Sequence, residues 1–152
     1  MFNWFIAVGI EEVGISFFDF YSVGHICMGI GIFLLFSLFY TIPMAKEEGS
    51  SQILLPLWGI WLITVIIGII WEIIENTLFF DLGIKFEGRL DSPANIISDI
   101  LCVALGGGGM WIFAHLIFKY QKKTWPYYLL GILGLAAWII VFLILRATTL
   151  IL

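Results

Sequence analysis

The sequence predicts an all-α membrane protein: a polytopic bundle of four transmembrane helices in one domain, residues 1–152, with an N-terminal interfacial or re-entrant helix. Hydrophobic residues make up 62% of the 152 residues and charged residues 12%, so little polar surface is left for a soluble domain. Four apolar runs are each long enough to cross a hydrocarbon core of about 30 Å at about 1.5 Å per residue. The 16 glycines favour close helix packing in lipid.

The first 20 residues are apolar but include Glu11, Glu12 and Asp19. Two adjacent glutamates at the centre of a spanning helix would be costly in hydrocarbon. We therefore expect segment 1–20 to lie at the membrane interface, and a fifth span is the alternative. The three carboxylates are expected to be solvated there; covering a site as a lid is the other interpretation.

The four spans are expected at about residues 21–43, 53–76, 93–118 and 126–150. Pro56 falls in the first turn of the second span, where its missing N–H is tolerated. Ser92-Pro93 is typical of a helix start, with serine as the cap and proline at the first helical position. Four consecutive glycines, 106–109, predict a close approach of another backbone, or a bend, in the third span.

Basic residues suggest an orientation. Four lysines (Lys46, Lys119, Lys122 and Lys123) fall in turns 44–52 and 119–125 or at their edge, against Lys85 and Arg89 in loop 77–92. The positive-inside rule then puts the two turns in the cytoplasm, and the N-terminus and loop 77–92 outside. The sequence thus predicts a multi-pass protein of the cell membrane.

Polar residues within the spans gather at this outer end. Glu72, Glu75 and Asn76 share a helix face through spacings of three and four, and Asp91, Asn95 and Asp99 recur every four residues. Arg146 lies about 30 Å along the fourth span, which returns it to the same end. The candidate catalytic residues are Glu72, Glu75 and Asp99; the candidate binding residues are His25, Asn76, Asp91, Asn95, Ser98 and Arg146.

Charges in hydrocarbon cost at least roughly 2.5 kcal/mol each, so these groups must be paired or ligated. Arg146 can neutralise one carboxylate through two hydrogen bonds, and a protonated His25 another. A divalent cation would use the rest: Ca²⁺ or Mg²⁺ with oxygen ligands alone, Zn²⁺ or Mn²⁺ with an imidazole. The candidate metal ligands are His25, Glu72, Glu75 and Asp99.

Most of these residues also have a structural interpretation. Glu72 and Glu75 could extend to the interface, Asn95 could bind a backbone carbonyl, and Arg146 could be a counter-ion. His115 lies near the opposite, basic end and is expected to be interfacial. Cys27 and Cys102 fall in apolar runs and are expected in the core.

Two paired motifs resemble a known group. Trp71-Glu72-x-x-Glu75-Asn76, followed by Asp91-Ser92-x-x-Asn95-x-x-Ser98-Asp99 and then Gly106, is similar to the VanZ-like group of small bacterial multi-pass membrane proteins. The resemblance covers about residues 20–110. It implies a role at the cell envelope, without an established reaction; VanZ itself is associated with low-level glycopeptide resistance.

Three functions follow, and the sequence leaves enzyme and non-enzyme undecided. The first is an envelope protein that binds a divalent cation, a lipid-like amphiphile or both, and hydrolyses a lipid-like substrate. The second is a non-catalytic binding or structural subunit, as a homo-oligomer or with a partner membrane subunit, in which the polar cluster fixes helix packing. The third is an ion or proton carrier, disfavoured because the inner halves of the spans lack charges. No basic patch predicts nucleic-acid binding.

Overall fold

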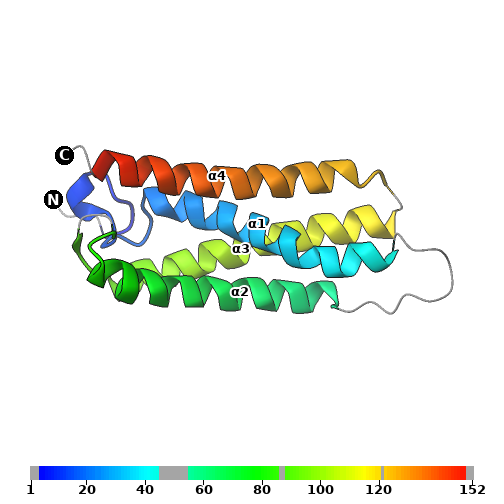
Figure 1. Ribbon diagram of the computed structural model, residues 1–152, viewed down its shortest axis with the longest axis horizontal. Coiled ribbons are helices and arrows are strands. Elements are labelled where there is room, and N and C mark those ends of the chain that lie inside the picture. Colours follow the sequence, from blue (N-terminus) through cyan, green and yellow to red (C-terminus); the bar gives the residue numbers. More distant parts are fainter. Residues whose placement is uncertain (1–3, 45–54, 86–87, 121, 150–152) are drawn as a thin grey trace.

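A computed structural model of the chain describes residues 4–44, 55–85, 88–120 and 122–149. Its main elements are four long helices that run side by side: α1 (Phe20–Met44), α2 (Leu57–Ile74), α3 (Pro93–Lys119) and α4 (Trp125–Thr149) (Figure 1). A π-helical turn, η2 (Glu75–Phe79), continues α2. All four helices are long and apolar enough to cross a membrane. The predicted all-α membrane bundle with four spans is therefore confirmed.

Residues 4–19 differ from the expected helix. They form an irregular segment with a single 3-10 turn, η1 (Ile10–Glu12), and one bridge between Ile6 and Phe18. Gly14 adopts a left-handed φ of +73°, and its N–H donates to the Asp19 carboxylate at 2.8 Å. Carboxylates that bind nearby backbone N–H groups stabilise turns in place of helix. The prediction of a helix here was wrong, and the segment does not form a fifth span.

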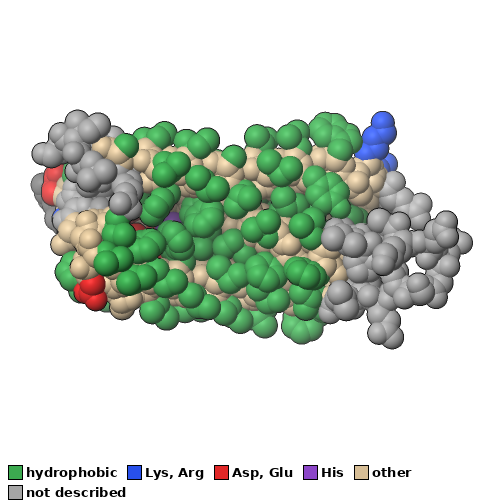
Figure 2. Space-filling view, viewed as in Figure 1, with side chains coloured by type: hydrophobic (Ala, Val, Ile, Leu, Met, Phe, Trp, Pro, Cys, Tyr) green, Lys and Arg blue, Asp and Glu red, His purple; other side chains and the backbone are tan. Residues whose placement is uncertain are grey.

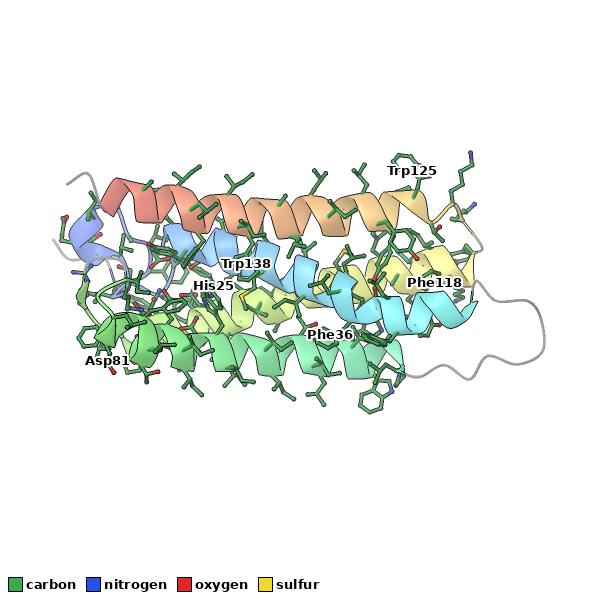
Figure 3. The ribbon with its side chains drawn as sticks, viewed as in Figure 1. His25, Phe36, Asp81, Phe118, Trp125 and Trp138 are labelled. Atoms are coloured by element: carbon green, nitrogen blue, oxygen red, sulfur yellow. The ribbon has the colours of Figure 1, made fainter. Side chains whose placement is uncertain are left out.

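This segment, which we call the cap, covers one end of the bundle (blue in Figure 1). We call that end, where α1 and α3 begin and α2 ends, the capped end. The opposite end, where α1 and α3 end and α2 and α4 begin, is the uncapped end. Figure 3 labels His25 toward the capped end and Phe118 and Trp125 at the uncapped end. Most of turn 44–52, Lys46 included, lies outside the described residues.

Helix α1 is central and packs against the other three. Its contact with α3 depends on glycine: a Cβ at Gly29 would lie 2.2 Å from the carbonyl oxygen of Val103, and one at Gly106 would lie 2.1 Å from that of Ile26. No side chain fits at those distances, so the two backbones can only approach this closely with glycine. Gly106, the first residue of the glycine run of α3, therefore allows the close approach of another backbone that the run predicts.

Hydrophobic side chains cover most of the face seen in Figure 2, as a lipid-exposed surface requires. Inside the uncapped end lies a buried apolar cluster: Phe33, Leu34, Leu57, Ile60, Met110, Ala114, Ile117 and Tyr127. A smaller cluster of Met28, Ile32 and Val103 lies nearer the capped end. The buried charged groups of the described residues lie beyond it, in the capped end and its loops.

Candidate functional site

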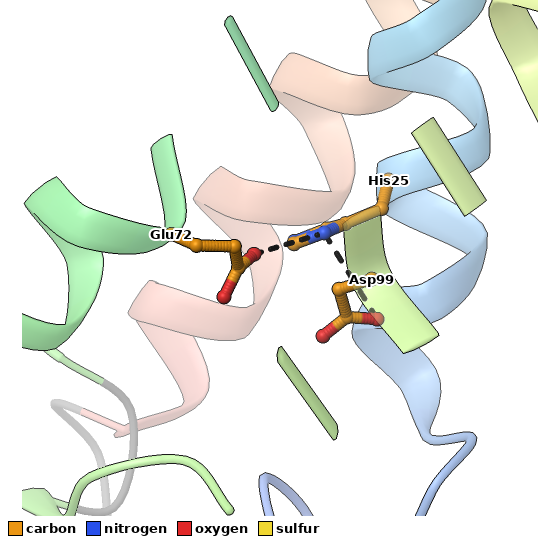
Figure 4. A group of neighbouring side chains, drawn as sticks. All are labelled: His25, Glu72 and Asp99. Carbon is orange, nitrogen blue, oxygen red and sulfur yellow. Dashed lines mark ion pairs between the residues drawn. The ribbon is translucent and has the colours of Figure 1, made fainter. Parts of the chain in front are cut away.

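Three helices each contribute one polar side chain to a buried cluster: His25 from α1, Glu72 from α2 and Asp99 from α3 (Figure 4). The three residues are 5%, 4% and 3% exposed. His25 Nδ1 lies 3.3 Å from Glu72 Oε1 and 3.9 Å from Asp99 Oδ1. One ligand atom from each residue lies within 4.8 Å of the other two, which is compact enough to hold a metal ion. We call these residues the His25–Glu72–Asp99 cluster.

Two atoms of the cluster lack a hydrogen-bond partner. Among the described residues, neither His25 Nδ1 nor Glu72 Oε1 has one, although both are buried and face each other. A buried polar atom left unpaired costs about 1–3 kcal/mol. A shared proton or a bound cation would satisfy both atoms at once. Asp99 is better supported, because Ser22 Oγ donates to its Oδ1 at 3.0 Å.

The helices present these side chains by continuing their buried stripes. On α2 the stripe runs through Ile60, Thr64 and Gly68 to Glu72 at a constant spacing of four. On α3 the stripe includes Asp99 with its neighbours Asn95, Ser98 and Cys102. The faces that pack the bundle therefore also carry the polar groups into its interior, and Glu72 cannot extend to the interface without leaving its stripe.

Lys85 forms a second polar group beside the cluster. Its Nζ contacts Asp91 Oδ2 and lies 3.5 Å from Glu75 Oε1, and its side chain is 3% exposed. Asn76 joins the same group, donating from Nδ2 to Asp91 Oδ2 at 3.0 Å and accepting from the Asp91 N–H at 2.9 Å. We call Glu75, Asn76, Lys85 and Asp91 the Lys85 network. These contacts connect the loop between α2 and α3 to the end of α2.

The cap is fastened to α3 and to the loop before it. Ser92 is an N-cap, accepting from the Asn95 N–H at 3.1 Å, as predicted. Its hydroxyl also donates to the carbonyl of Ile15 at 2.7 Å, and its N–H donates to that of Gly14 at 2.7 Å. Asn95 Nδ2 donates to the carbonyl of Ser16 at 3.1 Å. The cap thus lies directly over the start of α3.

Two further contacts hold the cap in place. Arg89 donates to the carbonyl oxygens of Ile10, at 3.1 Å, and Val13. Asp19 accepts from Asn95 Nδ2 at 3.2 Å and from the Tyr21 N–H at 2.8 Å. Glu12 is 7% exposed and accepts from the Val8 N–H at 2.8 Å. The expectation that the three carboxylates are solvated was therefore wrong for Glu12, which is buried, whereas Glu11 is exposed and Asp19 is partly buried.

Between the cap and the cluster lies a small cavity of about 10 Å³. A space of this size holds roughly one water-sized group. Its lining is rich in charged groups and includes Asp19, Glu75, Lys85 and Asp91 together with two members of the cluster, His25 and Asp99. A metal at the cluster would therefore have room for one small ligand on the side of the cap.

The structure brings most of the predicted site residues together. Of the four predicted metal ligands, His25, Glu72 and Asp99 form the cluster, whereas Glu75 belongs to the Lys85 network. Ser98 is fully buried next to Asp99. The side chain of Arg146 lies outside the described part of the chain.

Sequence reasoning missed Ser22, Lys85 and Arg89 as members of the site. Ser22 lies one helical turn before His25 on α1, and that spacing was a usable signal. Lys85 and Arg89 were counted only for orientation, and nothing in their spacing shows that the loop folds back over the helix ends. His115 lies near the end of α3, away from the cluster, and is exposed.

A scan of protein-family models, a search of curated proteins and a search of solved structures each find no match to this chain. The geometry and chemistry of the buried cluster must therefore carry any functional assignment. The structure shows four helices that are long and apolar enough to span a membrane, and they enclose a His/Glu/Asp cluster near one end of the bundle.

Proposed function

We propose that this protein is a multi-pass protein of the cell envelope whose His25–Glu72–Asp99 cluster binds a divalent transition metal and acts on a lipid-like amphiphile. One observation carries the proposal. His25 Nδ1 and Glu72 Oε1 are buried, face each other at 3.3 Å and have no hydrogen-bond partner among the described residues. A metal ion bound to both atoms and to Asp99 would give each of the two unpaired atoms a bonding partner.

The donor set favours some metals over others. One imidazole and two carboxylates suit Zn²⁺ or Mn²⁺, whereas Ca²⁺ and Mg²⁺ prefer oxygen ligands alone. Three protein ligands with a fourth position open are typical of catalytic zinc sites. A zinc ion held by His25, Glu72 and Asp99 would supply a water activated for hydrolysis at neutral pH. Ser22, which donates to Asp99, would orient that ligand, since such outer contacts fix the position of metal ligands.

The surroundings of the cluster agree with a cation. Among the described residues around it, five are carboxylates, namely Asp19, Glu72, Glu75, Asp91 and Asp99, and two are cations, Lys85 and Arg89. A buried surplus of negative charge is unfavourable unless protons or a cation balance it. A divalent ion would remove most of that surplus.

The location within the envelope is part of the same proposal. The lysine-rich turns favour a cytoplasmic uncapped end, and the capped end then lies on the outer side. The resemblance to the VanZ-like group supports an envelope role for the same residues. The site would therefore serve the outer leaflet, where lipid-like substrates of the envelope are accessible.

The test is elemental analysis of the detergent-purified chain after exposure to Zn²⁺ or Mn²⁺. We expect about one metal ion per chain in the wild type and less than about a tenth of that in His25→Gln, Glu72→Gln and Asp99→Asn, since each removes one of three ligands. His115→Gln is the matched control, because it removes an exposed imidazole from the same bundle. Circular dichroism would check that each variant is folded.

Metal binding should also stabilise the fold. At a free metal concentration of 100 times the dissociation constant, the free energy of unfolding should rise by about 2.7 kcal/mol in the wild type. The three cluster variants should show no such rise. A wild type that binds neither metal would refute the metal centre and favour the structural alternative, in which the cluster only fixes the register of α1, α2 and α3.

A further inference from the structure

A second small cavity lies on another side of His25, between α1, α2 and α4. It also measures about 10 Å³. Four aromatic rings line it, from Tyr21 on α1, Trp71 on α2, and Trp138 and Phe142 on α4. The remaining lining residues are Gly24, His25, Glu75 and Val141. We call this space the aromatic cavity. It shares Tyr21, His25 and Glu75 with the cavity under the cap, so these residues are reached from two sides.

Side chains alone close the aromatic cavity between α2 and α4. Within the described ranges, no Cα of α2 or η2 lies within 8 Å of a Cα of α4. Aromatic contacts bridge that gap: the Trp71 ring centroid lies 5.2 Å from that of Trp138 and 5.7 Å from that of Phe142. Rotation of one ring would therefore open a passage without separating packed backbones.

This side of the bundle is covered mostly by hydrophobic side chains, as a surface in contact with lipid would be. Figure 2 shows a recess toward the capped end in which a histidine and a carboxylate are visible behind apolar side chains. Figure 3 labels Trp138 and His25 in the same region, between α4 and α2. The cap covers the end of the bundle, whereas this recess opens on its side. A ligand dissolved in the bilayer could thus approach the cavity laterally.

The lining specifies the charge and size of a ligand. Aromatic faces attract a cation, and cages of aromatic rings bind ammonium ligands in other proteins. Lys85 Nζ lies 3.5 Å from one oxygen of Glu75, and the Trp71 side chain also donates to this carboxylate, which can accept further hydrogen bonds. Because the space of about 10 Å³ admits only one water-sized group, it favours a primary ammonium over the larger trimethylammonium.

We infer that the aromatic cavity, formed by Tyr21, Trp71, Glu75, Trp138 and Phe142, binds a primary ammonium group that enters from the bilayer between α2 and α4. The inference goes beyond the metal centre and does not require it. It would identify the class of amphiphile that the site receives, one with an amine head group. It also agrees with the local charge, since a divalent metal and one ammonium would together balance the surplus of carboxylates around the cluster.

The test is native mass spectrometry of the full detergent-purified chain with equal amounts of phosphatidylethanolamine, phosphatidylcholine and phosphatidylglycerol. We expect phosphatidylethanolamine to be retained about tenfold over the other two lipids. Glu75→Gln should abolish this preference, and Trp138→Leu should reduce it several-fold. Trp125→Leu, which removes an exposed indole from the far end of the same helix, should leave the preference unchanged.

A second arm adds free ethanolamine at the same concentration as the lipids. If free ethanolamine fails to displace phosphatidylethanolamine, the ligand of the site is a lipid. If free ethanolamine displaces the lipid and this displacement also depends on Glu75, the site binds an ammonium group but its ligand is a soluble amine. Equal retention of all three lipids by the wild type would overturn the inference, and so would an undiminished preference in a folded Glu75→Gln. Metal content is measured on the same preparations. Bound metal without a preference among the lipids refutes only the ammonium site. A preference for phosphatidylethanolamine without bound metal refutes only the metal centre.

Discussion

The two ends of the bundle use the same four helices for opposite purposes. At the uncapped end, the buried polar groups are few and hydrogen-bonded: the Tyr127 hydroxyl donates to Ser37, whose own hydroxyl donates to the Leu34 carbonyl at 2.7 Å. At the capped end, charged groups gather, and two atoms of the His25–Glu72–Asp99 cluster have no such partner among the described residues. One end is packed mainly by apolar side chains, and the other holds charged groups in a buried position.

The difference shows where this small protein can tolerate unfavourable interactions. Unpaired polar atoms destabilise a fold and persist only where the surroundings hold them in place. Here the tightly packed contact of α1 with α3 and the apolar cluster around Phe33 supply that rigidity. The same substitution should therefore have different effects at the two ends, which makes the comparison testable.

The largest effect is expected at Lys85. Lys85→Met removes the cation from Asp91 and Glu75 and leaves two carboxylates buried without it. Breaking a buried ion pair from one side typically costs about 3–5 kcal/mol. The same change at Lys122, which is exposed near the uncapped end, should cost less than about 0.5 kcal/mol. The free energy of unfolding of both variants can be measured by a denaturing titration in mixed micelles. Equal losses in the two variants would show that the Lys85 network contributes no stability.

The helix contact near the middle of the bundle comes next. Gly106→Ala would place a Cβ 2.1 Å from the Ile26 carbonyl oxygen, so α1 and α3 must separate. Forced overpacking of this kind costs about 1–3 kcal/mol. Gly109→Ala lies three residues on, where nothing is found within 4 Å, and should be neutral or stabilising by up to about 1 kcal/mol. The melting temperatures of the two variants give the comparison, and a Gly106→Ala protein as stable as wild type would contradict the close contact.

The four spans were predictable because the thickness of the bilayer sets the length of a spanning helix. The apolar runs of the sequence then show where each span lies in the chain. The proximity of Glu72, Asp99 and His25 was also predictable. Successive spans cross the membrane in alternating directions, so the end of the second span lies on the same side as the starts of the first and third spans. Helical spacing then selected the buried faces. These are regular geometric constraints, which a sequence displays directly.

The cap was not predictable in the same way. Its shape depends on single contacts, such as the Gly14 N–H to Asp19 and Arg89 to the Ile10 carbonyl, that leave no periodic pattern. For the same reason Lys85 was counted as a loop charge although its side chain is buried. Irregular segments fold according to particular hydrogen bonds between residues far apart in the chain.

A smaller effect is expected where the cap joins α3. Ser92→Ala removes the helix cap and the hydrogen bond to the Ile15 carbonyl together. Loss of an N-cap costs about 1 kcal/mol, and the second bond should bring the total to about 2 kcal/mol. Hydrogen–deuterium exchange should show faster exchange across residues 4–19 while the uncapped end stays protected. Ser92→Thr, which keeps the hydroxyl, is the control; unchanged exchange in Ser92→Ala would show that other contacts suffice to hold the cap.

The smallest effect tests the well-paired end. Tyr127→Phe removes one hydroxyl from a fully buried side chain but leaves Ser37 bonded to the Leu34 carbonyl, so no polar atom loses its only partner. We expect a loss of about 1 kcal/mol in the free energy of unfolding, the net value of one such hydrogen bond. Metal content and lipid preference should not change, because the substitution lies at the end of the bundle opposite the cluster. A loss of bound metal in this variant would mean that the two ends are coupled through the helices, and the division between a packing end and a reactive end would no longer hold.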